Sequence, residues 1–140
     1  EESDRDQFLF LLMSHVVEPY LAKFDAPYAV YDFPASQAGL ARINNGYSAR
    51  FEVYYRGVEL ANGFHELTDP ALQNARFEED RHQRKARGLP EVSIDTNFIA
   101  ALSEGLPECS GVALGIDRAL ALALGQTAVD AVMSFGYSRS

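Results

Sequence analysis

Apolar residues recur at helical spacing near the start of the chain. Phe8, Leu12 and Val16 stand four positions apart, and each is followed by another apolar residue. This spacing places them along one side of a helix, so residues 4–17 are predicted to be helical, with Pro19 ending or kinking the helix. The apolar stripe is wide, which indicates a helix that is covered on two sides.

The rest of the chain mixes strand patterns with helix patterns. Residues 27–34 lie between two prolines with apolar positions on both faces, which predicts a short buried strand. Residues 34–48 have the pattern of a loop with an Asn-Asn-Gly turn. A further strand is predicted at 111–116, and helices are predicted at 69–87, 95–102, 117–124 and 127–133. Hairpin strands and helices that are unevenly interspersed favour an α+β fold with an antiparallel sheet.

Two carboxylates fall on one face of a predicted hairpin in the middle of the chain. A two-residue turn at residues 56–57 pairs Tyr54 with Glu59 and Glu52 with Ala61. Glu52 and Glu59 then lie diagonally on one face, about 7–8 Å apart. Such a pair is either part of a solvent-exposed acidic face or a site for a divalent cation. Mg²⁺ is typically held by one or two protein carboxylates together with phosphate oxygens.

The second strand of this hairpin is interrupted by Asn62-Gly63. Glycine inside a strand often marks a bulge. A bulge near Ala61 would bring Asn62, Phe64 and Glu66 to the same side as the two carboxylates. An amide, an aromatic wall and a carboxylate suit a ligand that carries an amine. A structural role on an edge strand is the alternative for these three residues.

Small residues line one face of the predicted strand at 111–116. Gly111, Ala113 and Gly115 alternate there with larger apolar residues. A flat ligand can lie directly on such a backbone, or a helix can pack closely across it. We expect Asp117 to cap the next helix, and Arg118, at its first position, to reach a phosphate or a purine ring. The glycine spacing matches neither a phosphate loop nor a dinucleotide fingerprint.

Composition narrows the possible classes of function. The 140 residues carry a net charge of −8, which disfavours general binding to nucleic-acid phosphates. No apolar run reaches the roughly 18 residues of a membrane-spanning helix. Cys109 is the single cysteine, which excludes an internal disulfide and fits a reducing compartment such as the cytoplasm. The histidines have no metal-ligand spacing.

Three separated segments together resemble the class II aminoacyl-tRNA synthetases. The strand that leads into Gly115-Ile-Asp-Arg118 is similar to motif 3 of that class. Residues 59–66, Glu-Leu-Ala-Asn-Gly-Phe-His-Glu, resemble the Glu-Ile-Gly-Asn-Gly-Phe-Ser-Glu signature of the lysyl enzymes. Residues 31–41 resemble the segment that precedes this signature. The resemblance follows the same order along most of the chain.

Within the lysyl branch, the chain looks closest to the short paralogues that lack an anticodon-binding domain and attach (R)-β-lysine to elongation factor P. Residues 33–37, Phe-Pro-Ala-Ser-Gln, match those paralogues. Ala61 and His65 replace the glycine and serine that are usual in the synthetases. Ala113 replaces the middle glycine of motif 3, and its methyl group would reshape the amino-acid pocket in favour of a β-amino acid.

The resemblance implies an ATP-dependent ligase. The carboxylate of (R)-β-lysine, or of lysine, would attack the α-phosphate of ATP to give an aminoacyl-adenylate and pyrophosphate. The acyl group would then pass to a lysine amine of elongation factor P. The implied roles are Mg²⁺ binding by Glu52 and Glu59, ATP binding by Glu59, Leu60, Gly115 and Arg118, catalysis by Glu59 and Arg118, and amino-acid binding by Asn62, Phe64, Glu66 and Ala113.

The resemblance also implies an incomplete catalytic domain. Motif 3 lies at residues 111–118, whereas motifs 1 and 2 have no counterpart in residues 1–140. The chain is therefore expected to be the C-terminal portion of a class II catalytic domain, with open sheet edges, exposed apolar surface and little or no activity alone. The full-length parent is expected to be a cytoplasmic homodimer that binds neither tRNA nor membranes.

Two alternatives to this reading stay open. The chain could come from a lysyl-tRNA synthetase that charges tRNA, which an N-terminal anticodon-binding barrel in the parent would indicate. It could also be a non-catalytic, synthetase-like binding module. The combination of Glu52, Glu59, Glu66 and Arg118 argues against the second alternative, since a module without catalysis needs none of them.

Overall fold

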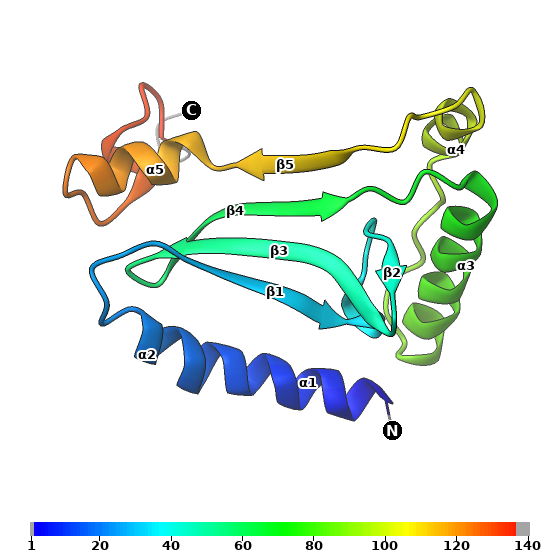
Figure 1. The fold of residues 1–140 in the computed structure, drawn as a ribbon, viewed down its shortest axis with the longest axis horizontal. Helices are drawn as coiled ribbons and strands as arrows, with labels where there is room; N and C mark the ends of the chain where they lie inside the picture. The colour runs from blue at the N-terminus through cyan, green and yellow to red at the C-terminus, as the bar shows by residue number, and fades with distance from the viewer. Residues whose placement is uncertain (1, 137–140) are drawn as a thin grey trace.

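An antiparallel sheet forms the centre of the fold in the computed structural model, which describes residues 2–136 (Figure 1). The strand order is β1 (Tyr28–Pro34), β3 (Tyr47–Tyr55), β4 (Val58–His65) and β5 (Ser110–Leu114), and β2 (Ile43–Asn44) pairs with the start of β3. All of these pairings are antiparallel. The predicted α+β fold with an antiparallel sheet is therefore confirmed.

Helices flank the sheet along one side and at its two ends (Figure 1). Helices α1 (Glu2–Leu12) and α2 (Glu18–Leu21) run beside β1 and are joined by a π-helical turn, Met13–Val17. Helices α3 (Pro70–Ala86) and α4 (Thr96–Ser103) pack together at one end of the sheet. Helix α5 (Ile116–Ala123) follows β5 at the other end, and short 3₁₀ turns lie at Ala35–Gln37 and Val129–Ala131.

The N-terminal helix differs from its prediction in two ways. It continues past Pro19 to Leu21, because the proline takes the second position of α2, within the first turn, where its missing N–H costs little. The π-helical turn directly before it shifts the backbone hydrogen bonds at the point where a proline cannot donate one. The helix is also not covered on two sides, since Phe8 is 65% exposed and Phe10 is 71% exposed.

Strand β1 lies at an edge of the sheet, so the prediction of a buried strand is wrong. Among the described strands it pairs only with β3, and Tyr31 is 69% exposed. Asp32 has a φ of 58°, and the ladder shifts register between Tyr31 and Phe33. The apolar residues on both faces of β1 reflect this irregularity and an uncovered surface, not burial on both sides.

Both predicted turns form. Asn45 and Gly46 have φ values of 51° and 84°, and Arg56 and Gly57 have φ values of 50° and 78°. Two successive positive φ values define a type I′ turn, whose twist matches that of the strands it joins. The second of these turns fixes the start of the β3–β4 register.

Helices α3 and α4 begin at the predicted capping residues. The Asp69 carboxylate accepts hydrogen bonds from the backbone N–H groups of Ala71 and Leu72, at 2.9 and 3.0 Å. Asp95 accepts equivalent bonds from Asn97 and Phe98, both at 3.0 Å. Each cap satisfies two of the N–H groups that the first turn of a helix leaves without a partner.

Helix α5 begins differently from its prediction. Gly115, and not Asp117, occupies the N-cap position, so Arg118 is the third helical residue instead of the first. The reason is that the Gly115 N–H donates to the Leu60 carbonyl at 2.8 Å, which holds Gly115 against β4, so that the helix begins at Ile116, earlier than predicted. The helix predicted at 127–133 is reduced to the 3₁₀ turn at Val129–Ala131.

Strand β5 is the second open edge of the sheet. It pairs only with β4 within residues 2–136, and its apolar side chains are uncovered. Val112 is 62% exposed, Leu114 is 53% exposed and the following Ile116 is 65% exposed. The expected open edge with exposed apolar surface is therefore present.

Candidate active site

A β-bulge sets which residues share the candidate site. The β3–β4 ladder pairs Tyr54 with Glu59 and Val53 with Ala61, so Leu60 is the extra residue on β4. A bulge of this kind shifts the alternation of side chains by one position. The sequence predicted a bulge near Ala61, and the structure places it one residue earlier.

The bulge brings the polar residues of β4 to the face that holds the two glutamates. Glu52 pairs with Asn62, so the predicted pairing of Glu52 with Ala61 is wrong by one residue. Residues that pair across strands project to the same face, which puts Asn62 and Phe64 on the face of Glu52 and Glu59. The predicted grouping of these side chains is therefore confirmed, although Ala61 projects to the opposite face.

Glu66 lies on the small-residue face of β5. In the β4–β5 ladder, Asn62 pairs with Ala113 and Phe64 pairs with Gly111. A Cβ atom placed on Gly111 would collide with a carboxylate oxygen of Glu66. The absence of a side chain at Gly111 is thus what allows the Glu66 carboxylate to lie where it does.

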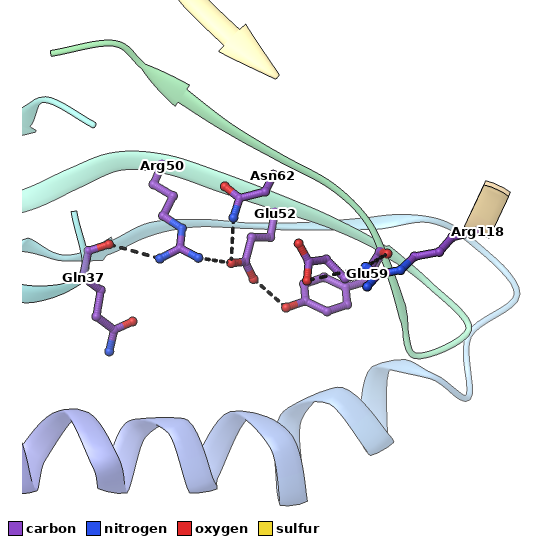
Figure 2. A network of polar contacts seen from close by, with 7 residues as sticks. Gln37, Arg50, Glu52, Glu59, Asn62 and Arg118 are labelled. Atoms are coloured by element: carbon purple, nitrogen blue, oxygen red, sulfur yellow. Dashed lines mark hydrogen bonds and ion pairs between the residues drawn. The ribbon is translucent and has the colours of Figure 1, made fainter. Parts of the chain in front are cut away.

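Glu52 is buried and receives hydrogen bonds from three side chains (Figure 2). It forms an ion pair with Arg50, and the Tyr54 hydroxyl donates to its second oxygen at 2.5 Å. The Asn62 amide approaches the first oxygen at 3.5 Å. Arg50 also donates to the Gln37 carbonyl at 3.1 Å. These contacts fix the direction of the Glu52 carboxylate.

The partners of Glu52 were not predicted from the sequence. Arg50 also lies over the Phe33 ring, 4.5 Å from its centre, and Tyr54 stacks on Tyr28 with 5.4 Å between the ring centres. The available signal was the two-residue alternation on β3, which puts Arg50, Glu52 and Tyr54 on one face.

Tyr54 acts as a hydrogen-bond donor in this network. Burial raises the pKa of the Tyr54 hydroxyl well above its ordinary value near 10, and the hydrogen bond to Glu52 raises this pKa further. The hydroxyl therefore keeps its proton at neutral pH and donates a hydrogen bond to the Glu52 carboxylate.

Glu59 and Arg118 form the accessible part of the site near the end of β5 (Figure 2). Arg118 donates to the Glu59 backbone carbonyl at 2.9 Å, and its guanidinium lies 3.9 Å from the Glu59 carboxylate. The Arg118 side chain is 52% exposed and the Glu59 side chain is 38% exposed. Both charged groups can therefore reach a bound ligand without leaving this position.

The residues present fit a divalent cation and a phosphate-bearing ligand. Glu52 and Glu59 offer two carboxylates from neighbouring strands on one face, and Asn62 has a buried Oδ1 without a hydrogen-bond partner in the described structure. Among the side chains that the structure describes, in residues 5–136, no group of three or more His, Cys, Asp or Glu residues could hold a metal. Mg²⁺ held by one or two carboxylates plus substrate phosphates matches this donor set.

A cleft of about 490 Å³ separates the N-terminal helix from the Glu52 end of this face. Leu9, Met13 and Val17 line it from the helix, and Glu52 and Tyr54 line it from β3. The helix thus shields the Glu52 network on one side.

Among residues 2–136, every helix is too short or too polar to cross a lipid bilayer.

Curated relatives match nearly the whole chain. Proteins from Klebsiella pneumoniae (strain 342), Salmonella gallinarum and Hamiltonella defensa are 54%, 53% and 55% identical to it over 142 residues. All three are named elongation factor P–(R)-β-lysine ligase. Each alignment covers 99% of this chain and 43% of the relative, so the chain spans less than half the length of these proteins.

A protein-family model also matches most of the chain. The model of the class II tRNA synthetases for D, K and N matches residues 13–139. This range includes both the hairpin signature and the strand that resembles motif 3. The resemblance inferred from those segments is confirmed, and the chain belongs to the class II tRNA synthetase family.

Proposed function

We propose that this chain is part of an ATP-dependent ligase that activates (R)-β-lysine, or lysine, as an aminoacyl-adenylate and transfers it to a lysine side chain of elongation factor P. The main support is the 54% identity, over 99% of the chain, to a relative that is named elongation factor P–(R)-β-lysine ligase. The arrangement of Glu52, Glu59, Asn62 and Phe64 on one face, with the Glu66 carboxylate beside Gly111 on the same side, supports it further.

The two glutamates would hold Mg²⁺, which supplies charge neutralisation at the phosphates when it is bound. Glu52 is held in one orientation by Arg50 and Tyr54, so little reorganisation is needed for it to act as a ligand. Arg118 lies beside Glu59 and provides a permanent positive charge for phosphate oxygens.

The amino-acid pocket would lie over the small-residue face of β5. Glu66 would pair with an ammonium group of the substrate, and the free Oδ1 of Asn62 would accept a second N–H. Phe64 provides an apolar wall for the methylene groups. The Ala113 methyl group lies on the same face as Gly111 and narrows the pocket at one point.

The nucleotide would lie toward the end of β5, over Gly115. The hydrogen bond from the Gly115 N–H to the Leu60 carbonyl joins the two backbone segments assigned to ATP. The position of the bulge therefore also sets the floor of the proposed nucleotide site.

We further propose that residues 1–140 are the C-terminal portion of a class II catalytic domain, with motif 3 at 111–118. A protein about twice as long would supply the remaining contacts to the α-phosphate and the dimer interface. On this proposal the parent is a cytoplasmic homodimer that acts on a protein and not on tRNA.

ATP–pyrophosphate exchange by the full-length parent tests the proposed function. We expect a preference for (R)-β-lysine over L-α-lysine, followed by transfer of the label to elongation factor P. Preference for L-α-lysine with transfer to tRNA would instead make the parent a lysyl-tRNA synthetase. Lack of exchange with either amino acid would support a non-catalytic binding module.

A further inference from the structure

Three segments that are distant in the sequence meet at the Glu108 carboxylate. One of its oxygens lies 3.1 Å from an Arg42 guanidinium nitrogen and 3.2 Å from His65 Nε2. Arg42 lies just before β2, His65 ends β4, and Glu108 lies in the loop that leads into β5. We call these three side chains the Glu108 clasp.

Arg42 connects the clasp directly to the main chain of the candidate site. Its Nε donates to the Glu66 carbonyl at 2.9 Å, and a terminal nitrogen donates to the Thr68 hydroxyl at 3.1 Å. The remaining terminal nitrogen reaches Glu108. One rigid guanidinium fork therefore joins three acceptors, an arrangement that lysine cannot reproduce.

The peptide groups on both sides of Glu66 are held from the same region. The Glu66 N–H donates to the carbonyl of Cys109 at 3.0 Å, and Cys109 directly follows Glu108. Gly111, two residues after Cys109 in the chain, lies against the Glu66 carboxylate. The clasp thus joins β4 to the segment that both anchors Glu66 and borders its side chain.

The clasp lies on the opposite side of the strand from the proposed ligand. His65 and Glu66 are neighbours at the end of β4, so their side chains project to opposite faces. Glu108 and Arg42 therefore act on Glu66 through the backbone and without contact to the substrate. They are positioning residues and not catalytic ones.

We propose that the Glu108 clasp fixes the position of the Glu66 carboxylate and thereby sets the affinity for the ammonium group of the amino-acid substrate. The proposal rests on the proposed function, in which Glu66 binds that group. It predicts that weakening the clasp changes amino-acid binding selectively, because the residues assigned to ATP lie at the other end of β5.

The test compares Glu108→Ala with Glu104→Ala in the full-length parent by ATP–pyrophosphate exchange. Glu104 is an exposed carboxylate nearby that makes no side-chain hydrogen bond or ion pair in the described part of the chain. We expect Glu108→Ala to raise the KM for (R)-β-lysine roughly three- to fivefold, the effect that a part-exposed ion pair supports. The KM for ATP and kcat should change less than about twofold, and Glu104→Ala should change none of the three.

Conservative and single-arm variants separate positioning from a general loss of structure. Glu108→Gln keeps an oxygen acceptor for Arg42 and should restore most of the amino-acid affinity. His65→Ala removes one arm of the clasp and should show a smaller selective rise in KM, even if Glu108→Ala does not fold. A parallel rise in both KM values would overturn the proposal.

Glu66→Gln separates this proposal from the proposed function. If Glu66→Gln weakens amino-acid binding and Glu108→Ala does not, the clasp has no positioning role. If Glu66→Gln leaves amino-acid binding unchanged, the role of Glu66 in the proposed function is wrong, and the clasp proposal is wrong with it. Calorimetric titration of the amino acid alone checks both variants without turnover.

Discussion

The position of one carboxylate in this site depends on a glycine in the neighbouring strand. Glu66 occupies space that a side chain at Gly111 would take. The Glu66 backbone is held by its hydrogen bond to Cys109, so a side chain at residue 111 would displace the flexible end of the Glu66 side chain, which carries the carboxylate. At this position the size of a single side chain therefore controls a charged group in the proposed amino-acid pocket.

Gly111→Ala should weaken amino-acid binding. The added methyl group would displace the Glu66 carboxylate, and we expect the KM for (R)-β-lysine to rise about tenfold, equivalent to roughly 1.4 kcal/mol. Exchange kinetics of the full-length parent measure this effect. Ser110→Ala, at the preceding position and on the opposite face, is the matched control, and an unchanged KM for Gly111→Ala would contradict the assigned pocket.

Tyr54→Phe should make the stability of the protein less sensitive to pH in alkaline solution. The unfolded chain loses the Tyr54 proton near pH 10, whereas the folded chain keeps it to higher pH, since burial and the Glu52 hydrogen bond raise this pKa. Above about pH 10 the folded state therefore binds more protons than the unfolded chain. The stability that Tyr54 contributes is fully present below that pH and is lost as the pH rises above it. The denaturation midpoint of the parent should thus fall more steeply from about pH 9 to about pH 11 than that of Tyr54→Phe.

Tyr31→Phe is the control for this titration, because Tyr31 is 69% exposed. It removes a hydroxyl group from an exposed tyrosine, so a change that it shares with Tyr54→Phe does not come from the Glu52 network. If the denaturation midpoint falls equally steeply with pH in Tyr54→Phe and in the unmodified protein, folding does not raise the pKa of Tyr54.

Single residues of the site were predictable where their chemistry is carried by a recognisable spacing. Glu59, Asn62 and Glu66 belong to one short signature, and the structure places them on a common face. Arg50 was missed because its partner Glu52 had been assigned only to metal binding. A single sequence does not show which cation neutralises a buried carboxylate.

At the scale of elements, helix α3 depends on its first turn. Asp69 is the N-cap and accepts two backbone hydrogen bonds. We expect Asp69→Ala to lower the free energy of unfolding by about 1 kcal/mol, as is typical for loss of an N-cap. Chemical denaturation of the parent measures this change. Asn74→Ala, at an exposed position within the same helix, should be neutral or slightly stabilising, and an equal loss in both variants would rule out the cap as the cause.

Local chemistry explains which elements were predicted well. The turns at Asn45-Gly46 and Arg56-Gly57 and the caps at Asp69 and Asp95 follow from the preferences of a few adjacent residues. The burial of β1 and of the N-terminal helix depends on what packs against them, which hydrophobic patterns alone do not report. The exact position of the bulge also depends on a partner strand and on the Gly115 contact, both distant in the sequence.

The whole molecule presents an open sheet edge with apolar side chains. Val112 and Leu114 on β5 are more than half exposed, as are Phe8 and Phe10 on the N-terminal helix. An uncovered edge strand of this kind offers unpaired backbone groups and apolar surface to other chains. This surface fits a chain that covers 43% of the length of its relatives.

Residues 1–140 alone should therefore bind a hydrophobic dye and self-associate more strongly than the full-length parent, and should lack ATP–pyrophosphate exchange. Light scattering, dye fluorescence and the exchange assay measure these properties side by side. Val112→Lys should reduce the self-association by placing a charge on the open edge. Measurable adenylate formation by residues 1–140 would falsify the proposal that the contacts needed for activation are incomplete here.

The bulge on β4 links the spacing of the site residues to ligand binding. In a regular strand, positions on the same face are an even number of residues apart, yet Glu59 and Asn62 are separated by an odd step. A ligand that contacts both residues can do so only while the strand keeps its irregular form. Binding therefore selects the bulged register over the regular one, and the amide of Ala61 should exchange its hydrogen more slowly when such a ligand is present.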